Sequence, residues 1–318
     1  MTMPYKLTEE FPMCPVDSLC QCRRIVAIGG CGHGLGRVMA SLWFLGERLS
    51  GIVATTDDGG STGRLREVSG CIAWGDLRNC LNQLCSDSPN LARILFEYRF
   101  KNTGDISGHN LGNLILLAMD QMCVRPLDAI NLIRQMLQVS VELIPMSEEP
   151  ARLGAIVGGQ KVVGETAIDS LEQCPEKLII LPAIQPTSEA VVKIKESDMI
   201  ILGPGSFMTS VLPVLLMPEV AENIYNSSAL KVFIGNINQE MSVVGKMPIS
   251  DKLLWMKEMT GIYPDVLLWP AEKEQPDDLR CNIHTMPLVD VFQAGVHSRE
   301  ALRKGLDEIA GTLFLQVI

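Results

Sequence analysis

The chain has 318 residues, enough for one large α/β domain or two smaller ones, and carries 37 acidic against 27 basic residues. The resulting net charge of −10 argues against a protein that binds the nucleic-acid backbone, which requires a basic face. Binding of a small nucleotide remains possible, because such a ligand needs only a few hydrogen-bond donors. With 47% hydrophobic and 20% charged residues, the chain can bury a sizeable core, which excludes intrinsic disorder.

Residues 1–22 contain acids and prolines but no apolar stretch of the signal-peptide type, so we expect an N-terminal extension. The longest apolar run, 207–217, is too short to cross a bilayer and contains Pro213. The ten cysteines are scattered and lack the C-x-x-C pairs of a structural zinc site. Together these features predict a cytoplasmic protein with reduced thiols and no membrane contact.

The first predicted element is a buried parallel strand at 25–28, followed by the glycine-rich segment 29–36. A helical pattern at 38–45 and a second apolar run at 52–54 complete the outline of a βαβ unit. Glycines before a helix let the backbone approach an anion, although the spacing matches neither G-x-G-x-x-G nor a Walker A loop. A tight turn without a ligand is the alternative. The candidate ligand-binding residues here are Gly30, Gly32, His33 and Gly34.

The second strand ends in the polar segment 55–64, whose sequence is TTDDGGSTGR. Adjacent carboxylates beside hydroxyls are typical of a magnesium site, and Arg64 or Arg66 can meet phosphate oxygens. An acid about 20 residues after a glycine loop can instead bind a ribose hydroxyl. The alternative is an ordinary Asx turn. The candidates are Thr56, Asp57, Asp58, Ser61 and Arg64, with Asp57 and Asp58 as the metal ligands.

A helical lobe is expected over about 76–137, where apolar residues recur at helical spacing. Asp76 and Ser107 have the character of N-caps. Asn110 and Asn113 are three residues apart, so their amides can point at one ligand from the same helical turn. His109 is the candidate acid–base group, although the sequence shows no partner for it. The candidate residues of this lobe are Asp76, Asn79, His109, Asn110 and Asn113.

Short apolar runs around Gly158-Gly159 predict a hairpin, and strands then alternate with helices to the end of the chain. This pattern predicts a Rossmann-like, doubly wound α/β fold over 23–318, with a mainly parallel sheet, helices on both faces and the helical lobe embedded in it. The expected strands are 178–181, 199–202, 231–234 and 266–268. The expected helices are 189–195, 206–216, 251–259 and 299–313.

A fourth polar turn follows the strand at 199–202 and precedes a predicted helix. Its hydroxyls are well placed for a phosphate. Because loops after parallel strands gather at one edge of a sheet, we expect all four polar segments to form one nucleotide or phosphosugar cleft. The candidate residues of this turn are Gly203, Gly205, Ser206, Thr209 and Ser210.

The segments GGCGHGLGRV, TTDDGGSTGRLR, GDLRNCLNQL, FEYRF, GHNLGNLILLA and GPGSFMTS, in this order, resemble the CofD-like family. They are most similar to its bacterial gluconeogenesis-factor branch. The resemblance implies a Rossmann-like core with a helical subdomain. One branch of the family is the 2-phospho-L-lactate transferase of deazaflavin coenzyme synthesis, which uses a guanine nucleotide and magnesium. The other binds UDP-sugars such as UDP-N-acetylglucosamine and supports growth and cell shape on gluconeogenic carbon sources.

By this resemblance, Asp57 or Asp58 takes the metal role, and the GPGS turn and the GHNLGN helix start hold the nucleotide phosphates. One departure concerns Cys31, which lies between Gly30 and Gly32 where the family usually has a third glycine. A side chain there changes a loop that depends on bare backbone.

Three functions remain open. The first is a non-catalytic regulator that binds a UDP-sugar, favoured by the resemblance and by the lack of a visible nucleophile–base pair. The second is a Mg²⁺-dependent transferase acting on a nucleotide-activated substrate, for which positioning and charge neutralisation suffice. The third, hydride transfer with a dinucleotide, suffers from the mismatched glycine pattern. The sequence specifies neither a regulatory protein partner nor whether the chain forms a homo-oligomer.

Overall fold

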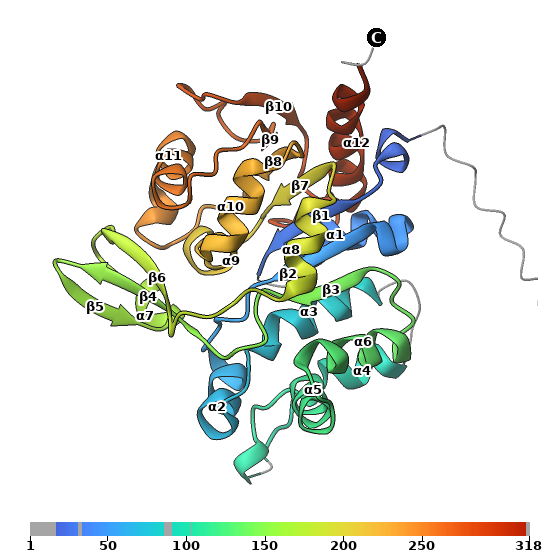
Figure 1. Cartoon of the computed structure of the whole chain (residues 1–318), viewed down its shortest axis with the longest axis vertical. Coiled ribbons are helices and arrows are strands. Elements are labelled where there is room, and N and C mark those ends of the chain that lie inside the picture. Colours follow the sequence, from blue (N-terminus) through green and yellow to red (C-terminus); the bar gives the residue numbers. More distant parts are fainter. Residues whose placement is uncertain (1–16, 31–33, 86–90, 103, 316–318) are drawn as a thin grey trace, which may run out of the picture.

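The computed structural model describes residues 17–30, 34–85, 91–102 and 104–315 (Figure 1). Its centre is a sheet of seven parallel strands in the order β10-β9-β8-β7-β1-β2-β3. Parallel strands bring their carboxyl ends to one edge, which places the turns that follow them side by side. The strands are β1 (Ile25–Gly29), β2 (Leu49–Val53), β3 (Glu142–Pro145), β7 (Met199–Leu202), β8 (Leu230–Ile234), β9 (Val266–Pro270) and β10 (Asn282–Met286).

Both faces of the sheet are buried, as the apolar strand β1 shows. Ile25 and Ala27 point into one core, and Val26 and Ile28 point into the other. The first core is covered by α1 (Leu35–Ser41), α3 (Trp74–Leu84) and α12 (Arg299–Leu315), and the second by α8 (Ser188–Lys195), α10 (Pro218–Asn226) and α11 (Ile249–Thr260). This confirms the predicted doubly wound, Rossmann-like arrangement.

A group of helices follows β2 and lies beyond one end of the sheet (Figure 1). Helix α5 packs against α3, α4 and α6, where the sequence predicted a helical lobe. Helix α2 follows β2 and precedes α3 in the chain, and its first turns include residues 60–64 of the polar segment 55–64. These helices are α2 (Gly60–Ser69), α4 (Leu91–Glu97), α5 (Leu111–Met122) and α6 (Pro126–Met136).

The predicted hairpin forms from β4 (Arg152–Val157) and β5 (Gln160–Val163), and the short helix α7 (Glu165–Asp169) follows it. The strand expected at 178–181 also forms, as β6 (Lys177–Leu181), but its place was predicted wrongly. It pairs antiparallel with β4 in a separate three-stranded sheet, order β5-β4-β6, instead of joining the parallel sheet. An apolar run alone does not reveal which sheet a strand joins.

Three further differences concern local patterns. β3 and β10 were not predicted, because β3 ends in Pro145 and β10 is a polar edge strand that is only partly buried. The helix expected at 206–216 is broken into a π-helical turn, Phe207–Val211, and α9 (Leu212–Leu215).

Among the described helices, none is by itself long and apolar enough to cross a membrane. One bent pair, Phe207–Leu215 with Pro218–Asn226, is long and apolar enough when the two helices are taken together.

Candidate functional site

The switch point of the sheet lies between its neighbouring strands β1 and β7, because the chain winds from β1 toward β3 on one side and from β7 toward β10 on the other. Ligands of open α/β sheets bind in this crevice. The turns after the two strands meet there backbone to backbone. A Cβ on Gly34 would lie 2.1 Å from the carbonyl oxygen of Pro204, and one on Gly30 would lie 2.7 Å from Asp76 Oδ2. Glycine is therefore required at Gly34, where the clash is with backbone, whereas a side chain at Gly30 would displace the Asp76 carboxylate. Gly32 and His33 lie outside the described residues, as does Cys31.

The turn after β7 is organised by two residues of the loop after β8, Asn236 and Glu240. The Gly205 N–H donates to Asn236 Oδ1 at 3.0 Å, and Asn236 Nδ2 donates to the Gly205 carbonyl at 2.8 Å. The N–H of Phe207, the first residue of the π-helical turn, donates to Glu240 Oε2 at 2.9 Å. A carboxylate of the chain itself thus occupies one of the backbone donors expected for a phosphate.

The hydroxyls of the same turn are mutually bonded. Thr209 Oγ1 donates to Ser206 Oγ at 2.8 Å. Thr209 and Ser210 are each only 2% exposed, whereas Ser206 is partly exposed. Gly203 takes a φ of 75°, which only glycine adopts readily. Ser206 is therefore the hydroxyl of this turn best placed to meet a ligand.

The two adjacent carboxylates after β2 have different partners. Asp57 Oδ1 accepts the Gly59 N–H at 2.8 Å, and the same carboxylate is hydrogen-bonded to Thr62. Asp58 Oδ1 accepts the N–H groups of Glu165 and Thr166, at 3.0 and 3.4 Å, and so caps α7. No group of three His, Cys, Asp or Glu side chains within the described ranges is arranged to hold a metal ion. A metal role for Asp57 and Asp58 stays a prediction.

Arg66, one of the two arginines expected to meet phosphate, is buried and supports this turn instead. Its guanidinium donates to the carbonyls of Thr56 and Asp57 at 3.0 and 2.8 Å, and also to Ala151. Because all three acceptors belong to the protein backbone, Arg66 fixes the shape of the turn. In the part of the chain described, Thr56 Oγ1 is buried without a hydrogen-bond partner.

Glu165 is a site residue that the sequence analysis missed. It is hydrogen-bonded to Thr209, and among charged neighbours the carboxylates of Asp57 and Asp76 affect its pKa most. Burial first, and these two charges second, raise its pKa to about 9. Burial also raises the pKa of Asp57. A protonated Glu165 makes the crevice less negative at neutral pH than its three carboxyl groups imply, which favours an anionic ligand.

Ser61, His109 and Asn113 meet where the N-terminal ends of α2 and α5 converge. Ser61 Oγ lies 3.1 Å from His109 Nδ1 and accepts from the Asn110 N–H at 3.3 Å and from Asn113 Nδ2 at 3.4 Å. His109 thus has the partner that the sequence did not show. We call Ser61, His109, Asn110 and Asn113 the serine–histidine cluster.

The capping predictions for this region were wrong in detail. Asn110, and not Ser107, caps α5: its Oδ1 accepts the N–H groups of Gly112 and Asn113 at 2.8 and 3.4 Å. Its Nδ2 donates to the Glu97 carbonyl, so both the oxygen and the nitrogen of the amide are bonded within the protein. Asp76 lies in the first turn of α3, after the N-cap position Ala73. Asn79 Oδ1 accepts from Arg78.

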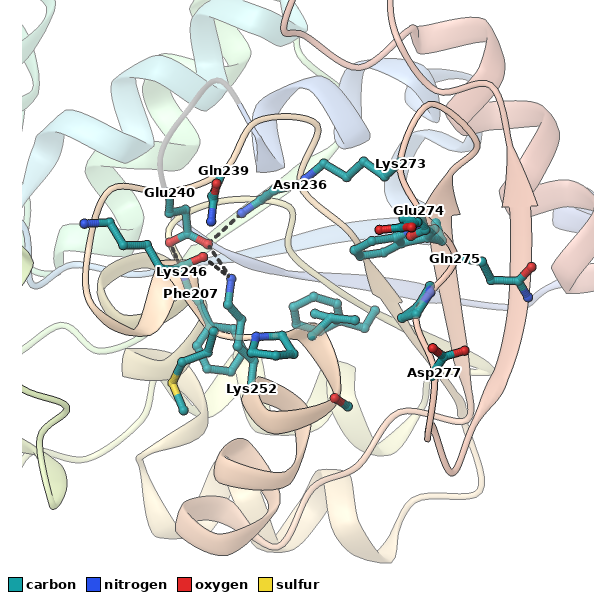
Figure 2. A pocket seen from close by; sticks show the side chains of 18 of the residues that line it. Phe207, Asn236, Gln239, Glu240, Lys246, Lys252, Lys273, Glu274, Gln275 and Asp277 are labelled. Carbon is teal, nitrogen blue, oxygen red and sulfur yellow. Dashed lines mark hydrogen bonds and ion pairs between the residues drawn. The ribbon is translucent and has the colours of Figure 1, made fainter.

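A pocket of about 620 Å³ opens beside the turn after β7, between the loops that follow β8 and β9 (Figure 2). The rings of Phe207, Phe233 and Trp269 line it together with Lys246, Lys252 and Lys273. In Figure 2, Asn236 and Glu240 lie at one side, and Glu274, Gln275 and Asp277 at the other.

Two lysines of the pocket are held near fixed partners. Lys252 Nζ donates to the Gly245 carbonyl at 2.7 Å and lies 3.8 Å from Glu240 Oε1. Lys273 Nζ lies 5.6 Å from the centre of the Trp269 ring. Burial lowers the pKa of both amines. The sequence analysis named no residue of this pocket as a site residue, and a polar run directly after a predicted strand, Asn236–Glu240, was the available signal.

Comparison with known proteins agrees with this architecture. The family model for the 2-phospho-L-lactate transferase CofD matches residues 25–291. Relatives from Yersinia pestis and Vibrio cholerae, both named "Putative gluconeogenesis factor", are 50% and 46% identical over 91% and 92% of this chain and 95% and 98% of their own.

Among solved structures, a UPF0052 family protein from Bacillus halodurans is similar, with a TM-score of 0.80 and 27% identity over 92% of this chain and 98% of that one. The family match covers the whole parallel sheet and the turns of the crevice. The chain therefore belongs to the CofD family.

Proposed function

We propose that the protein binds a nucleotide-sugar, of the UDP-sugar class, across the carboxyl edge of the sheet and acts as a cytoplasmic regulator of growth and cell shape on gluconeogenic carbon sources. The observation that carries the binding part is the continuity of the switch point with the 620 Å³ pocket. Phe207, Asn236 and Glu240 line the pocket and also hold the turn after β7. The names of the relatives support the regulatory part.

The proposed placement follows from the chemistry of each part. The turn after β7 suits a diphosphate, because the Phe207 N–H and the partly exposed Ser206 hydroxyl are donors that a phosphate can take. The rings and lysines of the pocket suit a flat or hydroxylated group that is joined to that diphosphate. On binding, the ligand phosphate competes with the Glu240 carboxylate for the Phe207 N–H, so we expect this loop to adjust.

Calorimetric titration of the full chain with UDP-N-acetylglucosamine, UDP-glucose, GDP and NAD, each with and without Mg²⁺, tests the proposal. We expect selective binding of the UDP-sugars. Lys273→Met should weaken that binding about tenfold, the effect of losing one charge-assisted contact. The matched control is Lys304→Met, since Lys304 is 70% exposed on α12. Absence of UDP-sugar binding to the native chain would refute the binding part.

A growth assay tests the regulatory part. A strain that lacks the gene should grow normally on glucose and poorly on a gluconeogenic carbon source, and the native chain should restore growth. Lys273→Met should restore it less well. Equal rescue by a variant that no longer binds UDP-sugars would separate the regulation from this ligand.

A second function, a Mg²⁺-dependent transferase acting on a nucleotide-activated substrate, is favoured by the match of residues 25–291 to the family model for the 2-phospho-L-lactate transferase CofD. Carboxylates are the usual protein ligands of Mg²⁺. Binding that prefers guanine nucleotides and requires Mg²⁺ would establish this function in place of the first.

A further inference from the structure

The serine–histidine cluster has a proton arrangement that its contacts determine. Ser61 Oγ accepts two N–H groups, from the Asn110 backbone and from Asn113 Nδ2. A hydroxyl oxygen has two lone pairs, so both are used and its own proton is left for His109 Nδ1 at 3.1 Å. With the Asn113 amide donating through Nδ2, as here, His109 is the acceptor, in the tautomer that a general base for this hydroxyl requires.

The main chain that carries His109 is fixed by two backbone hydrogen bonds. The main-chain N–H of His109 donates to the Ile106 carbonyl, and its main-chain carbonyl accepts the Phe100 N–H, both at 3.0 Å. The residue is 8% exposed. Burial, followed by the charges of Arg64 and Arg99, lowers the pKa of His109, so it is neutral and able to take a proton at neutral pH.

Positive charge borders the turn that carries His109. Arg64 donates to the Ser107 carbonyl at 3.0 Å and Arg99 to the Gly108 carbonyl at 2.7 Å, so both guanidinium groups border the turn that carries His109. Arg78 lies near enough to Arg99 for its pKa to be lowered by that charge as well as by burial. Its Nε is buried and, within the described chain, has no hydrogen-bond partner.

Ser61 is buried directly behind an exposed stretch of backbone. It is the second residue of α2, a ten-residue helix whose N-terminal end stabilises negative charge. The preceding Gly60 is exposed, and a Cβ built on it would meet no atom within 4 Å. Space is therefore open beside Gly60, the residue directly before Ser61, which is itself 6% exposed.

We propose that Ser61 is a nucleophile activated by His109, and that it accepts a phosphoryl group from an anionic phosphate ester or anhydride whose charge Arg64 and Arg99 neutralise. In this step Ser61 Oγ forms a bond to phosphorus and its proton passes to His109 Nδ1. The bond from phosphorus to the leaving oxygen breaks, and the leaving group takes the electron pair. Positioning and charge neutralisation are the main requirements of such a transfer. The step does not depend on the UDP-sugar proposal.

A fluorophosphonate probe tests the nucleophile directly, because such probes react with activated serines. We expect the native full chain to be labelled at Ser61, located by peptide mass spectrometry, and His109→Gln to slow the labelling about a hundredfold. Ser188 is the control within the same molecule: it is an exposed serine at the start of α8, where its hydroxyl donates to Glu189. It should stay unlabelled.

Acetyl phosphate tests the phosphoryl transfer. Incubation should add one phosphoryl group to Ser61, and Arg99→Gln should slow this transfer more than it slows labelling by the uncharged probe. Arg99 is exposed, so this variant keeps the test usable if His109→Gln does not fold. Failure to label Ser61 in the native chain, or equal labelling of Ser61 and Ser188, would show that the cluster is only a structural contact.

Discussion

The two sides of the crevice are built differently. On the side of α2, α3 and α5, the polar side chains are already hydrogen-bonded within the protein: Asp58 accepts main-chain N–H groups of α7, and Asn110 accepts those of α5. On the side of the β8 and β9 loops, a 620 Å³ volume stays open between aromatic rings and lysines. We call the side of α2, α3 and α5 the bonded side and the side of the β8 and β9 loops the open side. The bonded side holds its side chains in fixed positions, which suits groups that take part in a reaction. The open side can adapt to a ligand, which suits selection between ligands.

The largest expected effect comes from separating the two sides at the point where they touch. In Gly34→Ala, the added Cβ would lie 2.1 Å from the Pro204 carbonyl oxygen, a backbone atom that cannot move without the turn. We expect a loss of about 1–3 kcal/mol in the free energy of unfolding, the usual range for overpacking, and loss of measurable UDP-sugar binding. Urea denaturation and calorimetry measure the two effects.

Gly29→Ala is the matched control for that variant. The nearest atom to its Cβ would be Leu35 Cβ at 3.7 Å, an ordinary contact, only five residues before Gly34. It should bind normally and lose little stability. If both variants behaved alike, contact between the turns after β1 and β7 would not be what shapes the crevice.

The bonded side also shows how far the sequence could predict the site. Strand ends and glycine turns are local features, so the gathering of the four polar segments at one sheet edge was predictable. The partner of His109 was not, because Ser61 lies 48 residues away and its contact depends on how α2 packs near α5. The cap at Asn110 was missed for a smaller reason: the helix begins three residues later than Ser107 allows.

The open side was less predictable. Its lining comes from three stretches, around Phe207, Phe233–Lys252 and Trp269–Asp278, that meet only in the folded chain. None carries a dense glycine pattern. Glu165 was missed for the same reason, since an isolated acid after a hairpin has no special pattern until burial beside Asp57 and Asp76 changes its protonation.

A smaller effect should appear as a pH dependence that originates in the crevice. Glu165 keeps its proton in the folded chain up to about pH 9 but loses it near its ordinary value of 4.5 when unfolded. The folded state binds more protons between these values, so the free energy of unfolding falls as the pH rises, by at most about 1.4 kcal/mol per pH unit. Urea denaturation at pH 6, 7 and 8 measures this slope.

Glu165→Gln should flatten the slope, because the amide cannot ionise. A residual fall is expected from Asp57 and Asp169, whose pKa values burial also raises. Glu222→Gln, at an exposed position on α10, is the control and should leave the slope unchanged. An unaltered slope in Glu165→Gln would show that Glu165 is ionised in the folded chain.

The smallest effect separates the two adjacent aspartates. Asp58→Ala removes the cap of α7 and should cost about 1 kcal/mol of the free energy of unfolding. It should leave any Mg²⁺ dependence of ligand binding intact, because this carboxylate serves the fold. Asp57→Asn should do the reverse and abolish that dependence with little change in stability, since an amide oxygen can still accept the Gly59 N–H. Titrations of both variants with and without Mg²⁺, beside urea denaturation, decide it. Loss of the Mg²⁺ dependence in Asp58→Ala would contradict this assignment and show that the Asp58 carboxylate takes part in ligand binding.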